Sequence, residues 1–193
     1  MPPLTIGLTG GIAAGKSTAL AAFERLGAET ISSDAAVHEL LETEPLLGRL
    51  GERWGEDVVR DGKIDRARVG EIVFADPLQL AWLESQVHPL VGERIGAFLT
   101  SLPASAELAV VEVPLLFESG MEGVFDTSVA VIASDDVRRA RAEARGHTLV
   151  GEREARQLEQ DEKAERAEHV IENDGTPEQL EQALSALVEK LRG

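Results

Sequence analysis

The chain has 193 residues, which suits one domain and is long enough to bury a hydrophobic core without disulfides or structural metals. It contains no cysteine, which excludes a disulfide framework, a thiolate metal site and a cysteine nucleophile. The formal net charge of -16 argues against nucleic acid or an anionic membrane as partner, because phosphate groups would be repelled over most of the surface. No apolar run approaches the roughly twenty residues of a membrane span, and we expect a soluble, cytoplasmic protein.

A glycine-rich motif at residues 10–18 follows a short apolar run, residues 4–9, and precedes a helical pattern at 19–26. It matches G-x-x-x-x-G-K-[ST], in which backbone N–H groups hold phosphate oxygens, the lysine reaches the outer phosphates and the Ser or Thr hydroxyl ligates magnesium. The alternative is a glycine turn that happens to precede a lysine. A strand before the motif and a helix after it favour the phosphate loop, because they place a helix N-terminus against the anion. The expected ATP-binding residues of this loop are Gly11, Ala13, Ala14, Gly15, Lys16, Ser17 and Thr18, with Ser17 also a magnesium ligand.

A weak second strand at residues 29–32 leads to Asp34. Strand, loop, helix and strand form a βαβ start, and ligands of open α/β sheets bind at the carboxyl ends of the strands. We therefore expect Asp34 to face the phosphates.

Residues 35–102 show helical patterns and little strand. This segment is longer than a single crossover helix between two strands requires. Asp65 and Asp76 predict helix N-caps, the second directly before a proline at the first helical position. Pro89 predicts a kink or break in the long helix that follows. We expect a helical insertion beside the nucleotide core that receives the second substrate.

The strongest predicted strand covers residues 108–113 and carries Glu112 near its carboxyl end. Glu112 could hold a magnesium-bound water, as an acidic residue on the neighbouring strand does in phosphate-loop enzymes. The alternative is a solvated edge glutamate. Residues 128–133 predict another buried strand.

Two highly charged helices are expected at residues 135–145 and 152–167, around a glycine-bounded segment, as in a mobile lid. The alternative is two solvated helical faces. A last strand at residues 169–171 and a turn precede a final helix, which begins with a Thr-Pro-Glu-Gln capping pattern at 176–179 and runs to residue 191.

These elements predict a single α/β domain over residues 1–193, with a parallel sheet flanked by helices and a lid at about 137–167. The chain lacks N-K-x-D and D-x-x-G, so guanine specificity through those elements is unsupported and ATP is the expected nucleotide. A kinase of small metabolites fits the small size of the chain, its helical insertion and the cluster of arginines at residues 138–145.

The sequence resembles the dephospho-CoA kinase family along nearly its whole length. The resemblance implies a P-loop kinase fold and an Mg²⁺- and ATP-dependent enzyme that phosphorylates the ribose 3′-hydroxyl of dephospho-CoA. The residues that carry it are Ile6–Ile12 with Gly15–Thr18, Leu26–Gly27, Asp34, Asp65–Arg66, Val73–Phe74, Leu83–Glu84, His88–Pro89, Val113–Glu118, Arg141, Arg145, Gln160, Val170–Ile171 and Asn173.

On the acceptor side, the resemblance implies that Asp34 orients and deprotonates the attacking hydroxyl. It also implies that His88, Pro89 and the helical insertion receive dephospho-CoA, although His88 could equally be a packed structural histidine.

On the donor side, the resemblance implies that Arg141 and Arg145 belong to a lid that closes on the phosphates, where a guanidinium can bind two oxygens at once. It further places Asn173 in the loop against the adenine of ATP.

The sequence departs from the family pattern at several positions. Ala13 and Ala14 stand where the loop commonly has Gly-Ser, and residues 32–34 read Ser-Ser-Asp in place of Asp-Ala-Asp. His38 occupies a position often held by arginine, and Glu112 replaces the more usual aspartate. None of these changes removes an element that the chemistry needs.

Two other functions remain open on the sequence alone. A nucleoside or nucleoside-monophosphate kinase would share the core, the lid and the ATP chemistry. A nucleotide-dependent switch or assembly ATPase would use the phosphate loop as a conformational sensor, but the switch motifs are absent. ATP and dephospho-CoA are the expected partners, without an obligate protein partner.

Overall fold

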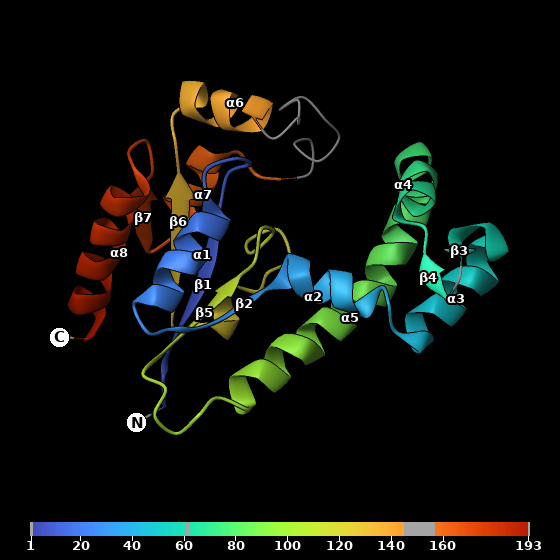
Figure 1. The fold of residues 1–193 in the computed structure, drawn as a ribbon, viewed down its shortest axis with the longest axis horizontal. Helices are drawn as coiled ribbons and strands as arrows, with labels where there is room; N and C mark the ends of the chain where they lie inside the picture. Colours follow the sequence, from blue (N-terminus) through green and yellow to red (C-terminus); the bar gives the residue numbers. More distant parts are fainter. Residues whose placement is uncertain (1, 61, 145–156, 193) are drawn as a thin grey trace. The chain divides into compact units, whose positions relative to one another are not determined.

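The computed structural model describes residues 2–60, 62–144 and 157–192, and these fold into two compact units (Figure 1). The core unit combines Met1–Ser32 with Leu102–Gly193, and the helical unit is Ser33–Ser101. Each unit has its own buried residues.

The core unit is built on a five-stranded sheet in the order β2-β5-β1-β6-β7, in which every neighbouring pair is parallel. This confirms the predicted parallel α/β core, with strands close to the expected positions. The strands are β1 (Leu4–Gly10), β2 (Glu29–Ser32), β5 (Leu108–Glu112), β6 (Thr127–Ile132) and β7 (His169–Glu172).

Alternate residues of the central strand β1 face opposite sides of the sheet, as the two-residue period of a strand requires. Ile6 and Leu8 are fully buried in the main hydrophobic cluster, together with apolar side chains of α1 and α8. A Cβ on Gly7 would lie 2.7 Å from the ring of Phe125 and 3.2 Å from Leu116, on the other face. Both faces are therefore covered, which explains why β1 has a continuous apolar sequence.

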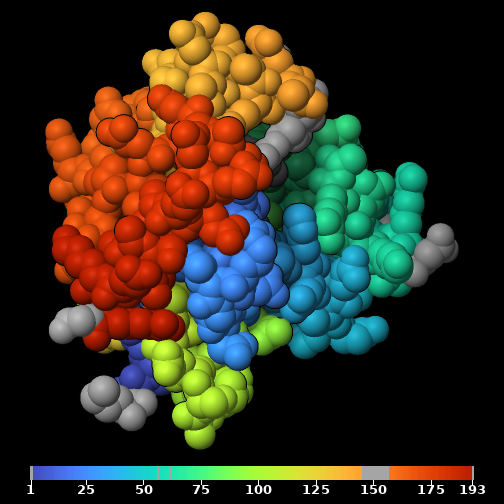
Figure 2. Space-filling model, turned by 60° about the vertical axis from the view of Figure 1, so that its left-hand side comes forward, coloured from blue at the N-terminus to red at the C-terminus, as the bar shows by residue number. Residues whose placement is uncertain are grey.

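The helices of the core unit are α1 (Lys16–Arg25), α6 (Asp135–Ala144), α7 (Gln160–Arg166) and α8 (Pro177–Arg192), with a short 3-10 turn, η2 (Glu122–Val124). Helices α1 and α8 pack side by side, and Figure 2 shows the red α8 against the blue α1. The capping pattern before α8 is confirmed, because Gln179 Oε1 accepts from the Thr176 N–H at 2.9 Å. Of the helix predicted at 152–167, residues 152–156 lie outside the described residues. The prediction is wrong for residues 157–159, which are not helical, and α7 begins at Gln160.

The helical unit contains α2 (Ser33–Leu40), α3 (Glu44–Trp54), α4 (Arg66–Ala75) and α5 (Pro77–Thr100), with a 3-10 turn, η1 (Glu56–Val58). Both predicted caps are confirmed: Asp65 accepts from the Arg68 N–H at 3.1 Å and Asp76 from the Leu78 N–H at 2.9 Å. The unit also contains a two-stranded antiparallel hairpin, β3 (Val59–Arg60) with β4 (Lys63–Ile64), in a region where the sequence predicts little strand.

Helix α5 continues through Pro89 and is not broken there. Proline removes the hydrogen bond to the carbonyl four residues earlier, which belongs to Ser85, an exposed residue. Water can satisfy that carbonyl, and Val87, Val91 and Ile95 keep a continuous buried stripe past the proline.

None of the helices within residues 2–60, 62–144 and 157–192 combines the length and the apolar character that crossing a membrane would need.

Candidate active site

The phosphate loop connects β1 to α1 and folds through three residues with positive φ. These are Gly10 (φ 149°), Ala13 (φ 60°) and Gly15 (φ 103°), and Gly15 is the N-cap of α1. A Cβ on Gly10 would lie 2.1 Å from the carbonyl oxygen of Val131, so only glycine fits this contact between β1 and β6. The loop therefore ends at a helix N-terminus, where backbone N–H groups are available to an anion.

Side chains hold the carbonyl groups of this loop. Lys16 Nζ donates to the carbonyl oxygens of Gly10 at 3.1 Å and Gly11 at 2.9 Å. The carbonyl oxygen of Ala14 accepts from Asn173 Nδ2 at 2.8 Å and from Arg141 Nη1 at 3.2 Å. These contacts on the carbonyls of Gly10, Gly11 and Ala14 give the loop a defined shape.

The structure brings most of the expected donor-side residues together at the start of α1. Lys16 and Thr18 are half-buried, whereas Ser17 is exposed in the first helical turn. Arg141, on α6, reaches the loop through Ala14. Arg145, which we expected beside it, lies outside the described residues.

Asn173 follows β7 and contacts the phosphate loop directly. It is 4% exposed, its N–H donates to the carbonyl of Ile132 at 2.8 Å, and its side-chain amide donates to Ala14. A Cβ on Gly15 would lie 2.2 Å from Asn173 Nδ2. Asn173 therefore supports the backbone at the N-terminus of α1, a contact that the sequence pattern did not reveal.

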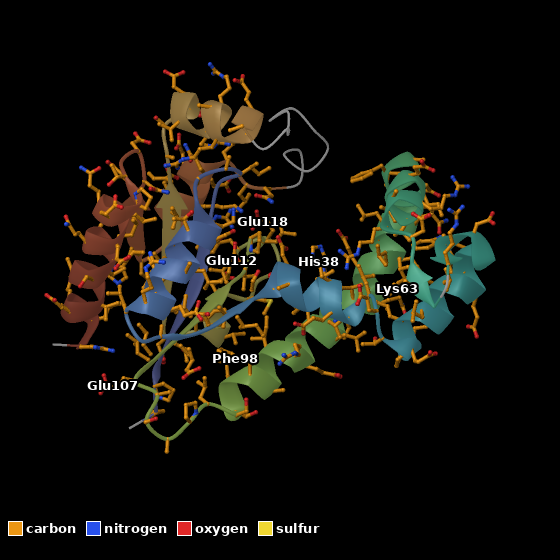
Figure 3. All side chains as sticks on the ribbon, viewed as in Figure 1. His38, Lys63, Phe98, Glu107, Glu112 and Glu118 are labelled. Carbon is orange, nitrogen blue, oxygen red and sulfur yellow. The ribbon has the colours of Figure 1, made fainter. Side chains whose placement is uncertain are left out.

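Glu112 lies at the carboxyl end of β5, the strand next to β1. It is 5% exposed and is in register with Leu8 on one side and Ser32 on the other (Figure 3). The alternative of a solvated edge glutamate is thus wrong, because Glu112 is buried and β5 lies between β2 and β1, not at an edge of the sheet. A buried carboxylate in this position needs a charged or hydrogen-bonding partner.

The residues expected on the acceptor side belong to the helical unit. Asp34 is exposed in the first turn of α2, two residues after the end of β2. His88 and Pro89 are exposed in the middle of α5, so His88 is not a packed core histidine of this unit.

A buried ion pair in the core unit was missed by the sequence analysis. Lys163, on α7, is completely buried, and its Nζ lies 3.0 Å from Glu118 Oε1. The same nitrogen donates to the carbonyl of Pro114 at 2.5 Å, which also accepts from the Thr9 hydroxyl at 3.2 Å. The pair therefore connects α7, the loop after β5 and the last residues of β1.

Burial lowers the pKa of Lys163 below its ordinary value of 10.5, while its hydrogen bond to Glu118 opposes that shift. Glu118 Oε1 also accepts from the Leu158 N–H at 2.8 Å, whereas its Oε2 is buried without a hydrogen-bond partner among the described residues. Figure 3 shows Glu118 in the loop that follows β5. The only sequence signal for the pair was that lysine is rare in this chain, which has four.

The sequence is similar to those of known dephospho-CoA kinases. The sequence profile of the family described as "Dephospho-CoA kinase" matches residues 4–179. The dephospho-CoA kinase of Anaeromyxobacter dehalogenans is 41% identical over 194 residues, covering 97% of this chain and 92% of that protein.

Two solved structures have a similar fold. A crystal structure of a Thermus thermophilus protein has a TM-score of 0.84 and 38% identity, covering 100% of both chains. A dephospho-CoA kinase from Campylobacter jejuni, at 23% identity and a TM-score of 0.69, also covers 100% of both chains and shows the same fold. The expected P-loop kinase fold is thereby confirmed, and the chain belongs to the dephospho-CoA kinase family.

Proposed function

We propose that this protein transfers the γ-phosphoryl group of ATP to the ribose 3′-hydroxyl of dephospho-CoA, giving coenzyme A and ADP. The observation that carries the proposal is the structured phosphate loop, Gly10 to Thr18, in a chain of this family. Phosphoryl transfer needs in-line placement and charge neutralisation more than covalent chemistry from the protein, so a rigid phosphate cradle supplies much of the catalysis.

On the donor side, the N–H groups of residues 13–18 and the N-terminus of α1 bind the phosphates of ATP. Lys16 leaves the carbonyls of Gly10 and Gly11 and pairs with the outer phosphates when the nucleotide arrives. The ammonium group of Lys16 is already at the loop. When ATP binds, this group exchanges two neutral carbonyl acceptors for a charged phosphate acceptor.

Ser17 and Glu112 have the donor atoms that suit Mg²⁺, a hydroxyl and a carboxylate oxygen. The exposed Ser17 lies in the first turn of α1, and the buried Glu112 ends the strand beside β1, so both belong to the phosphate-loop side of the core unit. In the proposed enzyme, Ser17 would hold the ion directly and Glu112 would hold one of its waters. When bound, Mg²⁺ neutralises charge on the β- and γ-phosphates.

On the acceptor side, Asp34 acts as general base for the ribose hydroxyl. Its exposed carboxylate follows β2 by two residues, and ligands of such sheets bind at the carboxyl ends of strands. The helical unit, including His88 and Pro89, binds the remainder of dephospho-CoA.

Arg141 and Arg145 stabilise the transferred phosphoryl group, since two guanidinium groups spread over its oxygens as charge develops. Arg141 is already beside the loop at Ala14. Asn173 contributes to the ATP site near the adenine, in addition to the backbone support described above. Both substrates are small molecules of the cytoplasm, where we place the enzyme, and the reaction requires no protein partner.

An acceptor assay tests the proposal. Purified protein, ATP and Mg²⁺ are incubated with dephospho-CoA, with a panel of nucleosides and nucleoside monophosphates, or without acceptor, and ADP and phosphorylated products are measured. We expect ADP formation that depends on dephospho-CoA. Transfer only to the panel would show a nucleoside or nucleotide kinase, and slow ATP hydrolysis unaffected by any acceptor would favour a switch or assembly ATPase.

A further inference from the structure

The peptide between Ile12 and Ala13 occupies an unusual conformation in the phosphate loop. Ala13 has a φ of 60° and is the non-glycine residue with positive φ within the described part of the chain. A residue with a Cβ is strained in the left-handed region and stays there only where its surroundings hold it. The contacts around this peptide therefore show what holds the loop in shape.

Arg138, on α6, makes the contact. Its Nε donates to the carbonyl oxygen of Ile12 at 2.9 Å, and its Nη1 donates to Asp135 Oδ1 at 3.1 Å. The Arg138 side chain is only 11% exposed, whereas that of Asp135 is 78% exposed. The guanidinium of Arg138 therefore points inward, onto the loop, while its ion-pair partner Asp135 is exposed to solvent.

Because the peptide is planar, a contact that fixes the carbonyl of Ile12 also fixes the direction of the Ala13 N–H. The described chain has no cis peptide bonds, so the carbonyl of Ile12 and the N–H of Ala13 point in opposite directions. Because Arg138 holds the carbonyl, the N–H of Ala13 points away from Arg138. Backbone N–H groups are what a phosphate loop offers to its ligand.

Arg138 also packs against the loop one residue earlier. A Cβ on Gly11 would lie 3.5 Å from Arg138 Nε and 3.0 Å from the Cβ of Gln160. Two residues later, Ala14 is held by Asn173 and Arg141. Between these points, Arg138 holds the carbonyl of Ile12.

We propose that Arg138 is a positioning residue that keeps the Ile12–Ala13 peptide oriented for phosphate binding, so that the loop binds ATP without first reorganising. The inference rests on the proposed function in one respect, that ATP binds this loop. Arg138 acts through the loop, because its Nε donates to the carbonyl oxygen of Ile12 and little of its side chain is exposed.

The test compares Arg138→Met with Arg139→Met by isothermal titration of the full-length protein with ATP and Mg²⁺. Arg139 is the next residue on α6, but its side chain is 61% exposed and pairs with Asp136 at 3.4 Å, so the two variants remove the same charge. Loss of a hydrogen bond from a charged donor predicts a rise in the Kd for ATP of roughly tenfold for Arg138→Met. Arg139→Met should stay within about twofold of the parent, since exposed pairs contribute little.

Steady-state kinetics separate positioning from a general loss of folding. Arg138→Met should raise the KM for ATP while kcat at saturating ATP and the KM for dephospho-CoA stay within about threefold, because the bound loop regains its shape. Arg138→Lys, which keeps a charged donor, should recover part of the ATP affinity. If Arg138→Met fails to fold, Arg138→Lys and Arg138→Gln provide the same comparison, with the weaker donor giving the weaker binding.

Equal ATP affinities for the parent, Arg138→Met and Arg139→Met would overturn the inference. A lower kcat with unchanged ATP affinity would also overturn it, because Arg138 would then act on the reacting groups. If the parent binds ATP but transfers no phosphate to dephospho-CoA, the proposed function fails while the Kd comparison still tests Arg138.

Discussion

At the scale of single residues, the phosphate loop depends on glycines where a side chain has neither space nor a suitable conformation. Gly15 combines a φ of 103° with a close approach to Asn173, whose Nδ2 would lie 2.2 Å from an added Cβ. Asn173 in turn supports Ala14. One methyl group at position 15 would therefore strain the backbone and also displace the amide that holds the loop.

We predict that Gly15→Ala lowers the free energy of unfolding by about 1–3 kcal/mol and raises the Kd for ATP at least about tenfold. Gly27→Ala is the matched control, since Gly27 has a φ of 87° but no atom within 4 Å of an added Cβ. The control should lose about 1 kcal/mol of stability to backbone strain and keep its ATP affinity. Urea denaturation and ATP titration measure both quantities, and equal ATP affinities for the two variants would contradict the role of the Asn173 contact.

Asp34 supports a second prediction at this scale. The amide of Asp34→Asn keeps the size of the side chain but cannot accept the hydroxyl proton, so kcat should fall by about 10²–10⁴-fold. The Kd for ATP should change little, because the proposed role concerns the acceptor. Rapid-quench measurement of phosphoryl transfer checks this, and near-normal turnover of Asp34→Asn would exclude Asp34 as the general base.

At the scale of elements, α7 is joined to the rest of the core unit by a buried charge. Lys163 contacts Pro114 and Glu118 in the loop after β5, and Glu118 also receives the N–H of Leu158 just before α7. Removing one partner of a buried pair leaves an uncompensated charge, so the pair fixes where α7 sits on β6 and β1.

The lowered pKa of Lys163 predicts a pH dependence of stability. Between its folded-state pKa and 10.5, the unfolded chain binds more protons at this residue than the folded protein, so this residue makes stability rise with pH. We expect the stability of the parent, relative to Lys163→Met/Glu118→Gln, to increase as pH rises toward 10.5 and to level off above it. Urea denaturation of both proteins from pH 7 to 11 measures the difference, and a difference that falls with rising pH would contradict the assignment.

The same elements show what the sequence could and could not predict. The caps at Asp65 and Asp76 and the glycine-rich loop were predictable, because each depends on neighbours within a few residues. The burial of Lys163 was not predictable, since the sequence of a helix with one buried lysine has the same charge pattern as that of a fully solvated helix. The burial of Lys163 depends on Glu118, 45 positions away in the chain. The strands β3 and β4 of the hairpin were missed for another reason, because each is too short to show a periodic pattern.

At the scale of the whole molecule, the net charge of -16 opposes the binding of polyanionic substrates, so local cations must provide the attraction. Lys16 and Arg141, which contact backbone carbonyls of the loop, supply cations there, whereas Arg138 supports the loop backbone at Ile12. The parallel sheet and the loop of the proposed donor site were predicted from sequence patterns. The residues that keep the loop in shape were not all identified, because Arg138 and Asn173 reach it from segments more than 120 residues away.

The central claim is that the phosphate loop delivers the γ-phosphoryl group of ATP to the 3′-hydroxyl of dephospho-CoA. The most direct measurement follows γ-labelled ATP into product and locates the label by ³¹P NMR and mass spectrometry. The account predicts one labelled 3′-phosphomonoester for each ATP consumed, and no product from an analogue that lacks the 3′-hydroxyl. Label recovered only as inorganic phosphate, or on another position or acceptor, would contradict it.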